Sequence, residues 1–179
     1  MAGNLIARSV HDLSAAAWFG GSLMGAVGLN GAAAHAKDPT ERIRLSSLGW
    51  KRWAPVQGTA IISHLVAGLA IVGDNKGRLA KQEGVGSLTV YKTAVTLAGA
   101  AVTLYAGVMG RRVEKFSHEG AAGATEPLQG ASRQLETAQR RLKLLQWCIP
   151  VLSGAVIVMG AKHGEMQRAG RVFKGLLGS

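Results

Sequence analysis

The chain has 179 residues, which is enough for one helical bundle and excludes a second sizeable domain. Its net charge of +11 could indicate nucleic acid binding, but the basic residues lie just outside the apolar stretches, which favours anionic membrane lipids as partners instead. The single cysteine, Cys148, excludes an internal disulfide and a cysteine-rich metal site. Hydrophobic residues make up 47% of the chain, yet the mean hydropathy is only +0.16, because alanine, glycine, valine and threonine supply much of the apolar content.

Four apolar stretches of about membrane-spanning length decide the predicted fold. They run over residues 13–36, 54–73, 88–110 and 144–161. A bilayer core about 30 Å thick needs about 20 residues of helix, and a chain inside lipid must pair its own backbone groups. We therefore predict an all-α protein, a four-helix transmembrane bundle in one domain over 1–179, in a bacterial inner membrane. A soluble helical bundle is the alternative, and a cleaved N-terminal signal is a weaker one.

The first stretch carries glycines on one helical face. Gly21, Gly25 and Gly28 follow one another at spacings of four and three, and the first two form a GxxxG pattern. In the third stretch, Gly99 shares a face with small and hydroxyl-bearing residues. Such faces let a neighbouring helix approach closely in a membrane, so we predict that these four glycines pack helices together.

The beginning of the chain also carries a resemblance to a known family. The sequence reads His11-Asp-Leu13 and then Trp18-Phe19-Gly20-Gly21. A histidine ahead of W-x-G-G resembles the opening helix of small prokaryotic four-helix membrane families, including the copper-resistance D-like proteins. The resemblance implies a helical integral membrane protein in which His11 could contact a metal ion.

Three ionisable residues are predicted at or near membrane depth: Asp12, His64 and Lys92. His64 is near the middle of the second stretch, and Lys92 is roughly 10 Å from the middle of the third. Antiparallel threading puts Asp12 and Lys92 near the same membrane face, where they could pair. Lys92 could instead reach the head groups along its stem. For His64 we expect a hydrogen bond to another helix, because polar side chains at this depth seek partners.

Haem and copper are the alternatives to a protein without cofactor. Threading places His11 and His64 about half a membrane apart, which predicts that they are not two axial ligands of one haem b. His64 or His11 alone could still ligate. Copper prefers imidazole and thioether ligands, but Met24, Met109 and Met159 form no cluster with a second ligand.

Tryptophans are expected at the ends of membrane spans. Trp50 and Trp53 precede the second stretch, and Trp147 lies near the start of the fourth. Amphipathic indole rings favour the membrane–water interface, so we predict all three there.

The last third of the chain is predicted to hold a loop, a long helix and a surface tail. Residues 117–132 are rich in small residues and predict a flexible loop. Residues 133–143 predict a helix that continues into the fourth span, where Pro150 should introduce a kink. The tail, residues 162–179, has apolar residues at helical spacing between basic ones, which predicts an amphipathic helix on the membrane surface.

Motifs for catalysis are missing from the sequence: it has no GxSxG, P-loop, HExxH or CxxC pattern. The first prediction is therefore a non-enzymatic accessory or scaffold protein, with a partner subunit or a homo-oligomer as its assembly. The second is a haem- or copper-binding membrane protein that uses His11 and His64. The third is a small transporter or proton-relay protein that uses Asp12, His64 and Lys92.

Overall fold

The computed structural model describes residues 2–168, with side chains from residue 5 onward, and this part of the chain is helical with no strands. Four long rods form it. The first rod is α1 (Ala2–Met24), a π-helical segment (Gly25–Leu29) and α2 (Asn30–Ala34), and the others are α3 (Pro39–Asp74), α5 (Val85–Lys115) and α6 (Arg133–Glu165). Two short helices, α4 (Lys76–Lys81) and a 3-10 turn (Ser117–Glu119), lie in the connections.

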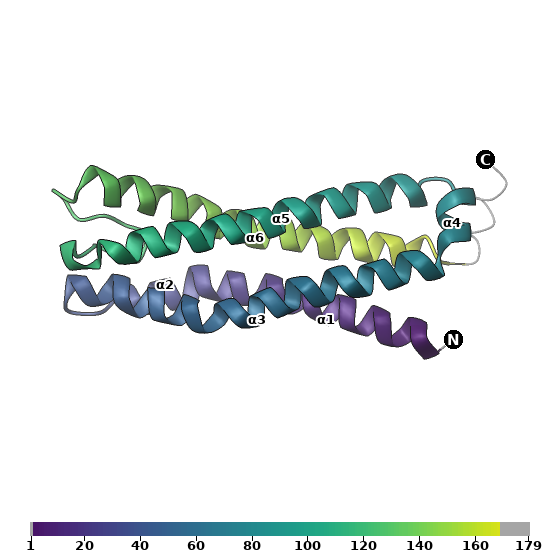
Figure 1. Ribbon diagram of the computed structural model, residues 1–179, viewed down its shortest axis with the longest axis horizontal. Coiled ribbons are helices and arrows are strands. Elements are labelled where there is room, and N and C mark those ends of the chain that lie inside the picture. The colour runs from purple at the N-terminus through teal and green to yellow at the C-terminus, as the bar shows by residue number, and fades with distance from the viewer. Residues whose placement is uncertain (1, 169–179) are drawn as a thin grey trace.

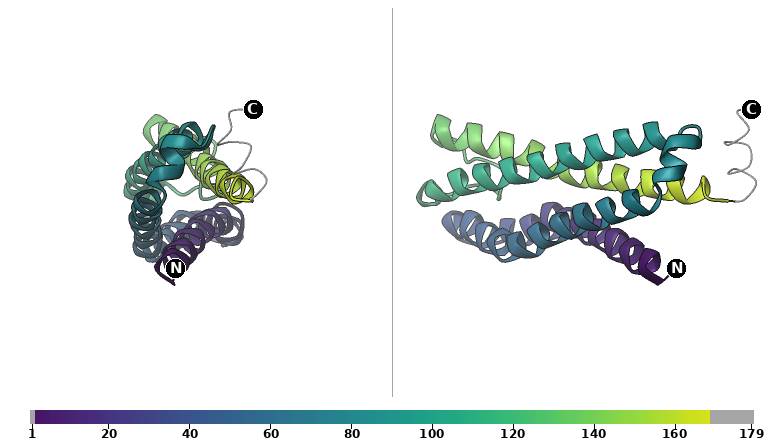
Figure 2. Two further views of the ribbon diagram at one scale, coloured as in Figure 1. Left: turned by 90° about the vertical axis from the view of Figure 1, so that its right-hand side faces the viewer. Right: turned by 45° about the vertical axis from the view of Figure 1, so that its right-hand side comes forward.

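The rods pack in a ring in which α1 contacts α3, α3 contacts α5, α5 contacts α6 and α6 contacts α1. Figure 1 shows α1 beside α3 below α5 beside α6, and the end-on view in Figure 2 places one rod at each corner. We call the end that carries α4 and the N-terminus the α4 end. The opposite end, with residues 35–38 and 116–132, is called the loop end. The first turns of α1 lean away from the other helices at the α4 end (Figures 1 and 2).

Two helices begin well before the apolar stretches that predicted them. Asp38 caps α3, since its carboxylate accepts a hydrogen bond from the Thr40 amide at 2.8 Å and Pro39 occupies the first turn. Most of the predicted connection before residue 54 is therefore helix. Ser132 caps α6 through the Leu135 amide at 3.2 Å, and the helix runs unbroken past Pro150, which confirms the predicted continuity of residues 133–143 with the fourth stretch.

Among residues 2–168, three helices are long and apolar enough to cross a membrane: α3, α5 and α6. The first rod is not among these helices. The π-helical segment divides its apolar part, so that α1 combines an apolar second half with a polar first half that includes Arg8, His11 and Asp12. The chain thus has the composition of a membrane protein in three of its four rods.

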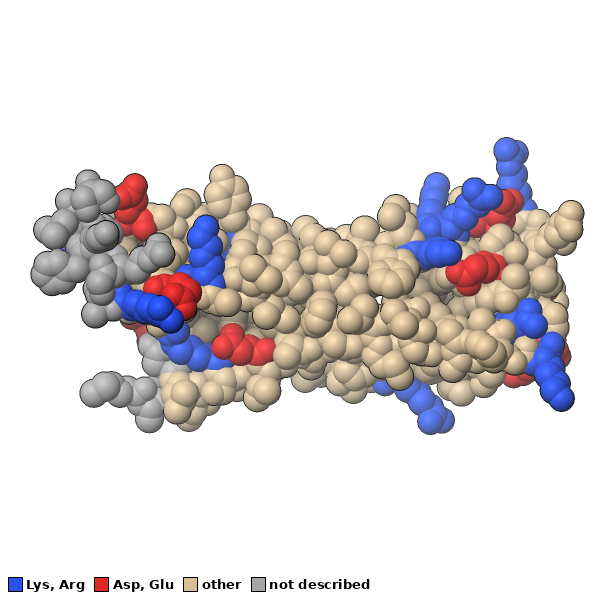
Figure 3. Space-filling view, turned by 180° about the vertical axis from the view of Figure 1, so that it is seen from behind, with Lys and Arg blue, Asp and Glu red and all other residues tan. Residues whose placement is uncertain are grey.

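The outer surface of the bundle is apolar between its two ends. Figure 3 shows charged side chains gathered toward both ends, with a broad uncharged band between them. Large apolar side chains face outward within that band, for example Leu69, Leu104 and Val158, which are 73%, 75% and 69% exposed. Polar side chains such as Gln57 and Ser153 are buried as well, beside an apolar core that includes Trp18, Met109 and Leu135. Because lipid solvates the apolar exterior and water does not, this arrangement suits a bilayer.

The glycine face of α1 receives tryptophan rings and not a helix backbone. A Cβ added at Gly21 would overlap the Trp53 ring, and one at Gly25 would overlap the Trp50 ring. Gly99 similarly leaves room for Trp18, which is completely buried.

Trp50 and Trp53 turn toward glycines of α1, whereas Trp147 is 46% exposed on the outside. The position of all three at a membrane–water interface stays a prediction. The atoms nearest to a Cβ added at Gly28 belong to Met24 of the same rod, and not to another helix as predicted.

The segment predicted to be a flexible loop folds back onto the loop end. Its residues Ala121 and Ala124 are buried, and the Arg42 guanidinium donates to the carbonyls of Ala36, Ala121 and Ala122. The Ser132 amide donates to the Glu119 carboxylate at 2.8 Å, which lowers the pKa of Glu119. These contacts attach the segment to α3 and α6, and its flexibility stays a prediction.

The predicted surface helix of residues 162–179 falls largely outside the described residues. Its first part, through Glu165, continues α6 without a break. The Arg78 and Gln82 side chains both donate to the carbonyl of Met166, which ties the end of α6 to the connection between α3 and α5.

Candidate functional site

The candidate site is a cluster of four side chains in the half of the bundle toward the α4 end. It comprises His11 and Asp12 from α1, His64 from α3 and Lys92 from α5. His11 lies nine residues after Ala2, His64 lies ten before Asp74, and Lys92 lies seven after Val85. At 1.5 Å per residue each is therefore about 10 to 15 Å from the end of its helix, so the antiparallel rods bring them to similar depth.

Three members of the cluster form a hydrogen-bonded chain. Nδ1 of His11 lies 2.8 Å from Oδ1 of Asp12, and its Nε2 lies 3.1 Å from Nζ of Lys92. An ammonium group only donates and a carboxylate only accepts. A neutral His11 with its proton on Nδ1 satisfies both contacts, because it donates to Asp12 and accepts from Lys92. The two neighbours thus select one tautomer.

This hydrogen-bonded chain of three side chains runs from the surface of the bundle to its interior. The Asp12 side chain is 76% exposed, His11 is 8% exposed, and Lys92 is half-buried. The amine of Lys92 lies near Gly160, where an added Cβ would stand 3.5 Å from Nζ. Asp12 and Lys92 are therefore joined through His11, and not by the direct ion pair that was one of the two alternatives from the sequence. The amine also turns toward His11, so it is not simply extended to the head groups.

His64 lies against His11. The two ring centroids are 3.9 Å apart with a 31° angle between the planes, and Nδ1 of His64 lies 3.0 Å from the backbone oxygen of His11. Since a carbonyl only accepts, Nδ1 carries the proton. His64 therefore has its predicted bond to another helix, with an α1 carbonyl as the acceptor.

The predicted half-membrane separation of His11 and His64 is wrong. It assumed that the first helix begins at residue 13, whereas α1 begins at Ala2 and places His11 well inside the bundle. The rings nevertheless pack with their centroids 3.9 Å apart and their planes tilted by 31°, whereas an iron with two axial imidazoles would have to lie between ring nitrogens. No group of three or more histidine, cysteine, aspartate or glutamate side chains that could hold a metal ion occurs among residues the structure describes.

A second polar cluster lies toward the loop end, around Asn30. Its Nδ2 donates to Oε1 of Gln146 at 2.7 Å, and its Oδ1 accepts from Ser46 at 2.9 Å and from Trp50 at 3.0 Å. Asn30 directly follows the π-helical segment, and its amide joins α2, α3 and α6. Sequence reasoning missed this network, although an asparagine inside a 24-residue uncharged stretch was a usable signal.

The residues of the family resemblance have local roles in this fold. Both ring nitrogens of His11 take part in the hydrogen-bonded chain with Asp12 and Lys92. Trp18 fills the core and donates to Thr103. Gly21 lies under Trp53, and Gly20 has an open surface. Comparisons of the chain with known protein families, with curated proteins and with solved structures find no match.

Proposed function

We propose that the chain is a four-span protein of a bacterial inner membrane, in which the first rod is the fourth span. The support is that residues 13–36 carry no charged side chain and that α1 packs along α3, one of the three apolar helices. The rod is weakly apolar because its glycines and Asn30 serve contacts inside the bundle. In a packed rod such residues are shielded from lipid by the neighbouring helices.

We further propose that this protein relays protons at the chain formed by Asp12, His11 and Lys92. The observation that carries the proposal is the pair of hydrogen bonds that places both nitrogens of one buried imidazole between a carboxylate and an amine. Ionisable groups at membrane depth are costly to keep, and they commonly mark ion or proton pathways. The proposal assigns no enzymatic reaction.

The relay step moves two protons and leaves the imidazole neutral. A proton passes from Nζ of Lys92 to Nε2 of His11, while the proton on Nδ1 of His11 passes to Oδ1 of Asp12. The amine and the carboxyl both end uncharged, so no charge is stranded on the buried ring. Asp12 directly precedes the uncharged residues 13–36, so its exposed carboxyl can then release its proton to water at the α4 end.

Buried polar groups continue beyond Lys92 toward the loop end. Thr96 donates to the carbonyl of Lys92, and Gln57 is only 5% exposed in the middle of α3. Nε1 of Trp53 and Nε2 of Gln57 are buried donors with no acceptor among the described residues. Buried donors of this kind commonly bind water, which would extend the path.

Proton uptake by proteoliposomes tests the relay. An internal pH dye would report flux driven by a potassium diffusion potential. We expect flux above that of empty liposomes, and we expect Lys92→Ala to reduce it to that background. Lys162→Ala removes the same charge from an exposed position of α6 and should keep the flux. Equal flux in all three proteins would contradict the relay.

An accessory or scaffold role is the second candidate. The observation that favours it is the satisfied network around Asn30, which holds three rods in fixed relation. A scaffold tolerates Lys92→Ala and co-purifies with a partner subunit or a second copy. A haem- or copper-binding protein that uses His11 or His64 would show a Soret band or bound copper, and either finding would displace both candidates.

A further inference from the structure

A groove lies between α1 and α3 on the outer surface of the bundle. It has a volume of about 480 Å³, and Ala17 and Ala60 are among the small residues that line it. Leu13 and Val56 are exposed at the groove, within the uncharged band, so it opens toward the lipid. This volume is within the range of small-molecule sites, roughly 300–1,000 Å³.

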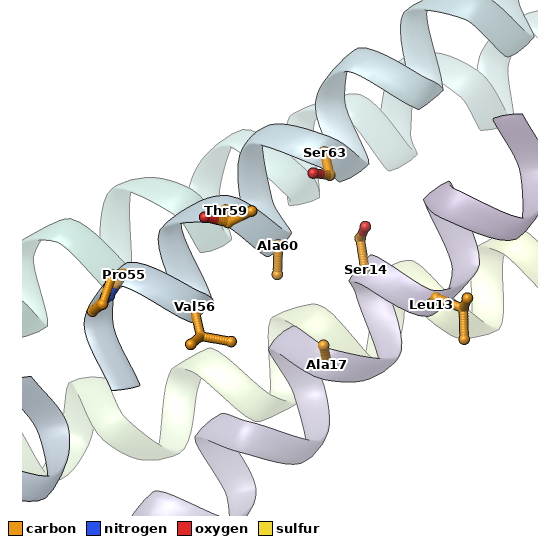
Figure 4. A pocket seen from close by; sticks show the side chains of 8 residues that line it. All are labelled: Leu13, Ser14, Ala17, Pro55, Val56, Thr59, Ala60 and Ser63. Atoms are coloured by element: carbon orange, nitrogen blue, oxygen red, sulfur yellow. The ribbon is translucent and has the colours of Figure 1, made fainter. Parts of the chain in front are cut away.

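Three hydroxyl groups in this groove have no partner. Ser14, Thr59 and Ser63 line it, and Figure 4 shows the Ser14 and Ser63 hydroxyls reaching toward the space between the two helices. Ser14 lies one turn from His11, and Ser63 is next to His64 in sequence. None of the three makes a hydrogen bond within the part of the chain that the structure describes.

Hydroxyls elsewhere in the uncharged stretches behave differently. These stretches, 13–36, 53–73, 93–110 and 144–161, hold eight serine and threonine residues. Four of them donate to a carbonyl of their own helix: Ser22, Thr96, Thr103 and Ser153. The remaining residue outside the groove, Thr93, is the first of its stretch and lies at the edge of the band. Unpaired hydroxyls away from water are costly, and lipid tails offer them no partner.

We propose that the groove binds a small apolar molecule from the bilayer that carries one hydroxyl or carbonyl head. The small lining residues leave room for its hydrocarbon part, and the three hydroxyls supply donors and acceptors for its oxygen. The commitment to a small molecule follows from the convergence of a few hydroxyl groups between small apolar residues of two helices. It is independent of the proton relay.

Equilibrium binding of radiolabelled farnesol to the reconstituted protein tests this site. Farnesol and its aldehyde supply the hydroxyl and the carbonyl head, and the corresponding hydrocarbon supplies neither. We expect saturable binding of the first two and only partitioning of the third. Ala17→Phe fills the groove and should abolish saturable binding. Replacement of the three hydroxyls together (Ser14→Ala, Thr59→Val, Ser63→Ala) should weaken it by about tenfold or more.

Thr93→Val is the matched control, because it removes an unpaired hydroxyl outside the groove and should leave binding unchanged. Absence of saturable binding for both oxygenated probes would overturn the proposal, as would equal binding of the hydrocarbon. If Ala17→Phe instead converts a dimer to a monomer and no probe binds, the groove is a contact between copies of this chain. Thermal unfolding of each variant in detergent separates loss of the site from loss of the fold.

Discussion

Individual glycines set how closely the rods of this bundle pack, and two neighbours in α1 make this testable. Gly21 lies under the Trp53 ring, while Gly20 has nothing within 4 Å of the position of an added Cβ. The same substitution at adjacent positions therefore has opposite physical consequences. At one it forces a ring to move, and at the other it adds only helix propensity.

We expect Gly21→Ala to lower the free energy of unfolding by about 1–3 kcal/mol, because an overpacked core must shift its side chains. Gly20→Ala should leave it unchanged or raise it by up to about 1 kcal/mol, as alanine favours helix over glycine. Thermal unfolding in detergent measures both. Equal destabilisation by the two variants would contradict the packing of Trp53 on α1.

At the candidate site, the sequence predicted the residues but not the contacts between them. Asp12, His64 and Lys92 could be singled out from the sequence, because ionisable residues in apolar stretches are rare. Their mutual arrangement could not be, since it depends on where α1 begins. The helix starts at Ala2 and not at residue 13, and these eleven residues move the helix end by about 16 Å. This difference explains why His11 and His64 were predicted to lie far apart but are in contact.

At the scale of the elements, the π-helical segment and the network around Asn30 hold the first rod to its neighbours. Both polar atoms of the Asn30 amide form hydrogen bonds, so removal of this side chain takes a hydrogen-bond partner from residues of α3 and α6. Leaving buried partners unpaired costs more than the lost bonds themselves.

Asn30→Ala should therefore destabilise the bundle by about 2–4 kcal/mol, since Gln146 and Ser46 both become unpaired. His35→Ala removes an exposed side chain whose bond to the Gly31 carbonyl is in its own rod, and it should change stability little. Chemical denaturation in mixed micelles gives both values. A double-mutant cycle with Gln146→Ala should show coupling of about 1 kcal/mol or more, and strictly additive losses would argue against the network.

The loop end should loosen at acid pH. The Ser132 amide stabilises the ionised form of Glu119, so its folded-state pKa is below the ordinary value of 4.5. This contribution is fully present above pH 4.5 and is lost as the pH falls through the lower, folded-state pKa.

Hydrogen exchange of the Ser132 amide measures this effect. Its protection, corrected for the intrinsic exchange rate, should fall as the solution is acidified below pH 4.5. In Glu119→Gln the protection should be weaker at neutral pH and should lose this dependence. Unchanged protection of the wild type down to pH 2 would contradict it.

The helices themselves could largely be predicted from the sequence, because apolar stretches of this length have few other structures. The helix over residues 133–143 could be predicted, whereas the early start of α3 could not be read from hydropathy, because residues 39–53 mix exposed charged side chains with exposed leucines. The capping residues of these two helices, Asp38 and Ser132, were the available signals. The folded loop end depends on contacts such as Arg42 with Ala121, which no local pattern reveals.

At the scale of the whole molecule, the apolar exterior connects the fold to both proposals. An uncharged, apolar exterior suits lipid, and the polar side chains buried beside the apolar core then have few partners other than one another, water or ligands. The relay and the groove both require α1 to cross the membrane, because His11 and Ser14 belong to it.

The most direct test is therefore the topology of the first rod. In a Cys148→Ser background, single cysteines at Ser9, Lys37 and Lys81 would be labelled with a membrane-impermeant maleimide in sealed, oriented vesicles. Leu104→Cys, in the middle of the exposed apolar band, serves as the unlabelled control. We predict that Ser9→Cys and Lys81→Cys react from one side and Lys37→Cys from the other. Reaction of Ser9→Cys and Lys37→Cys from the same side would contradict the four-span bundle, and the relay and groove proposals with it.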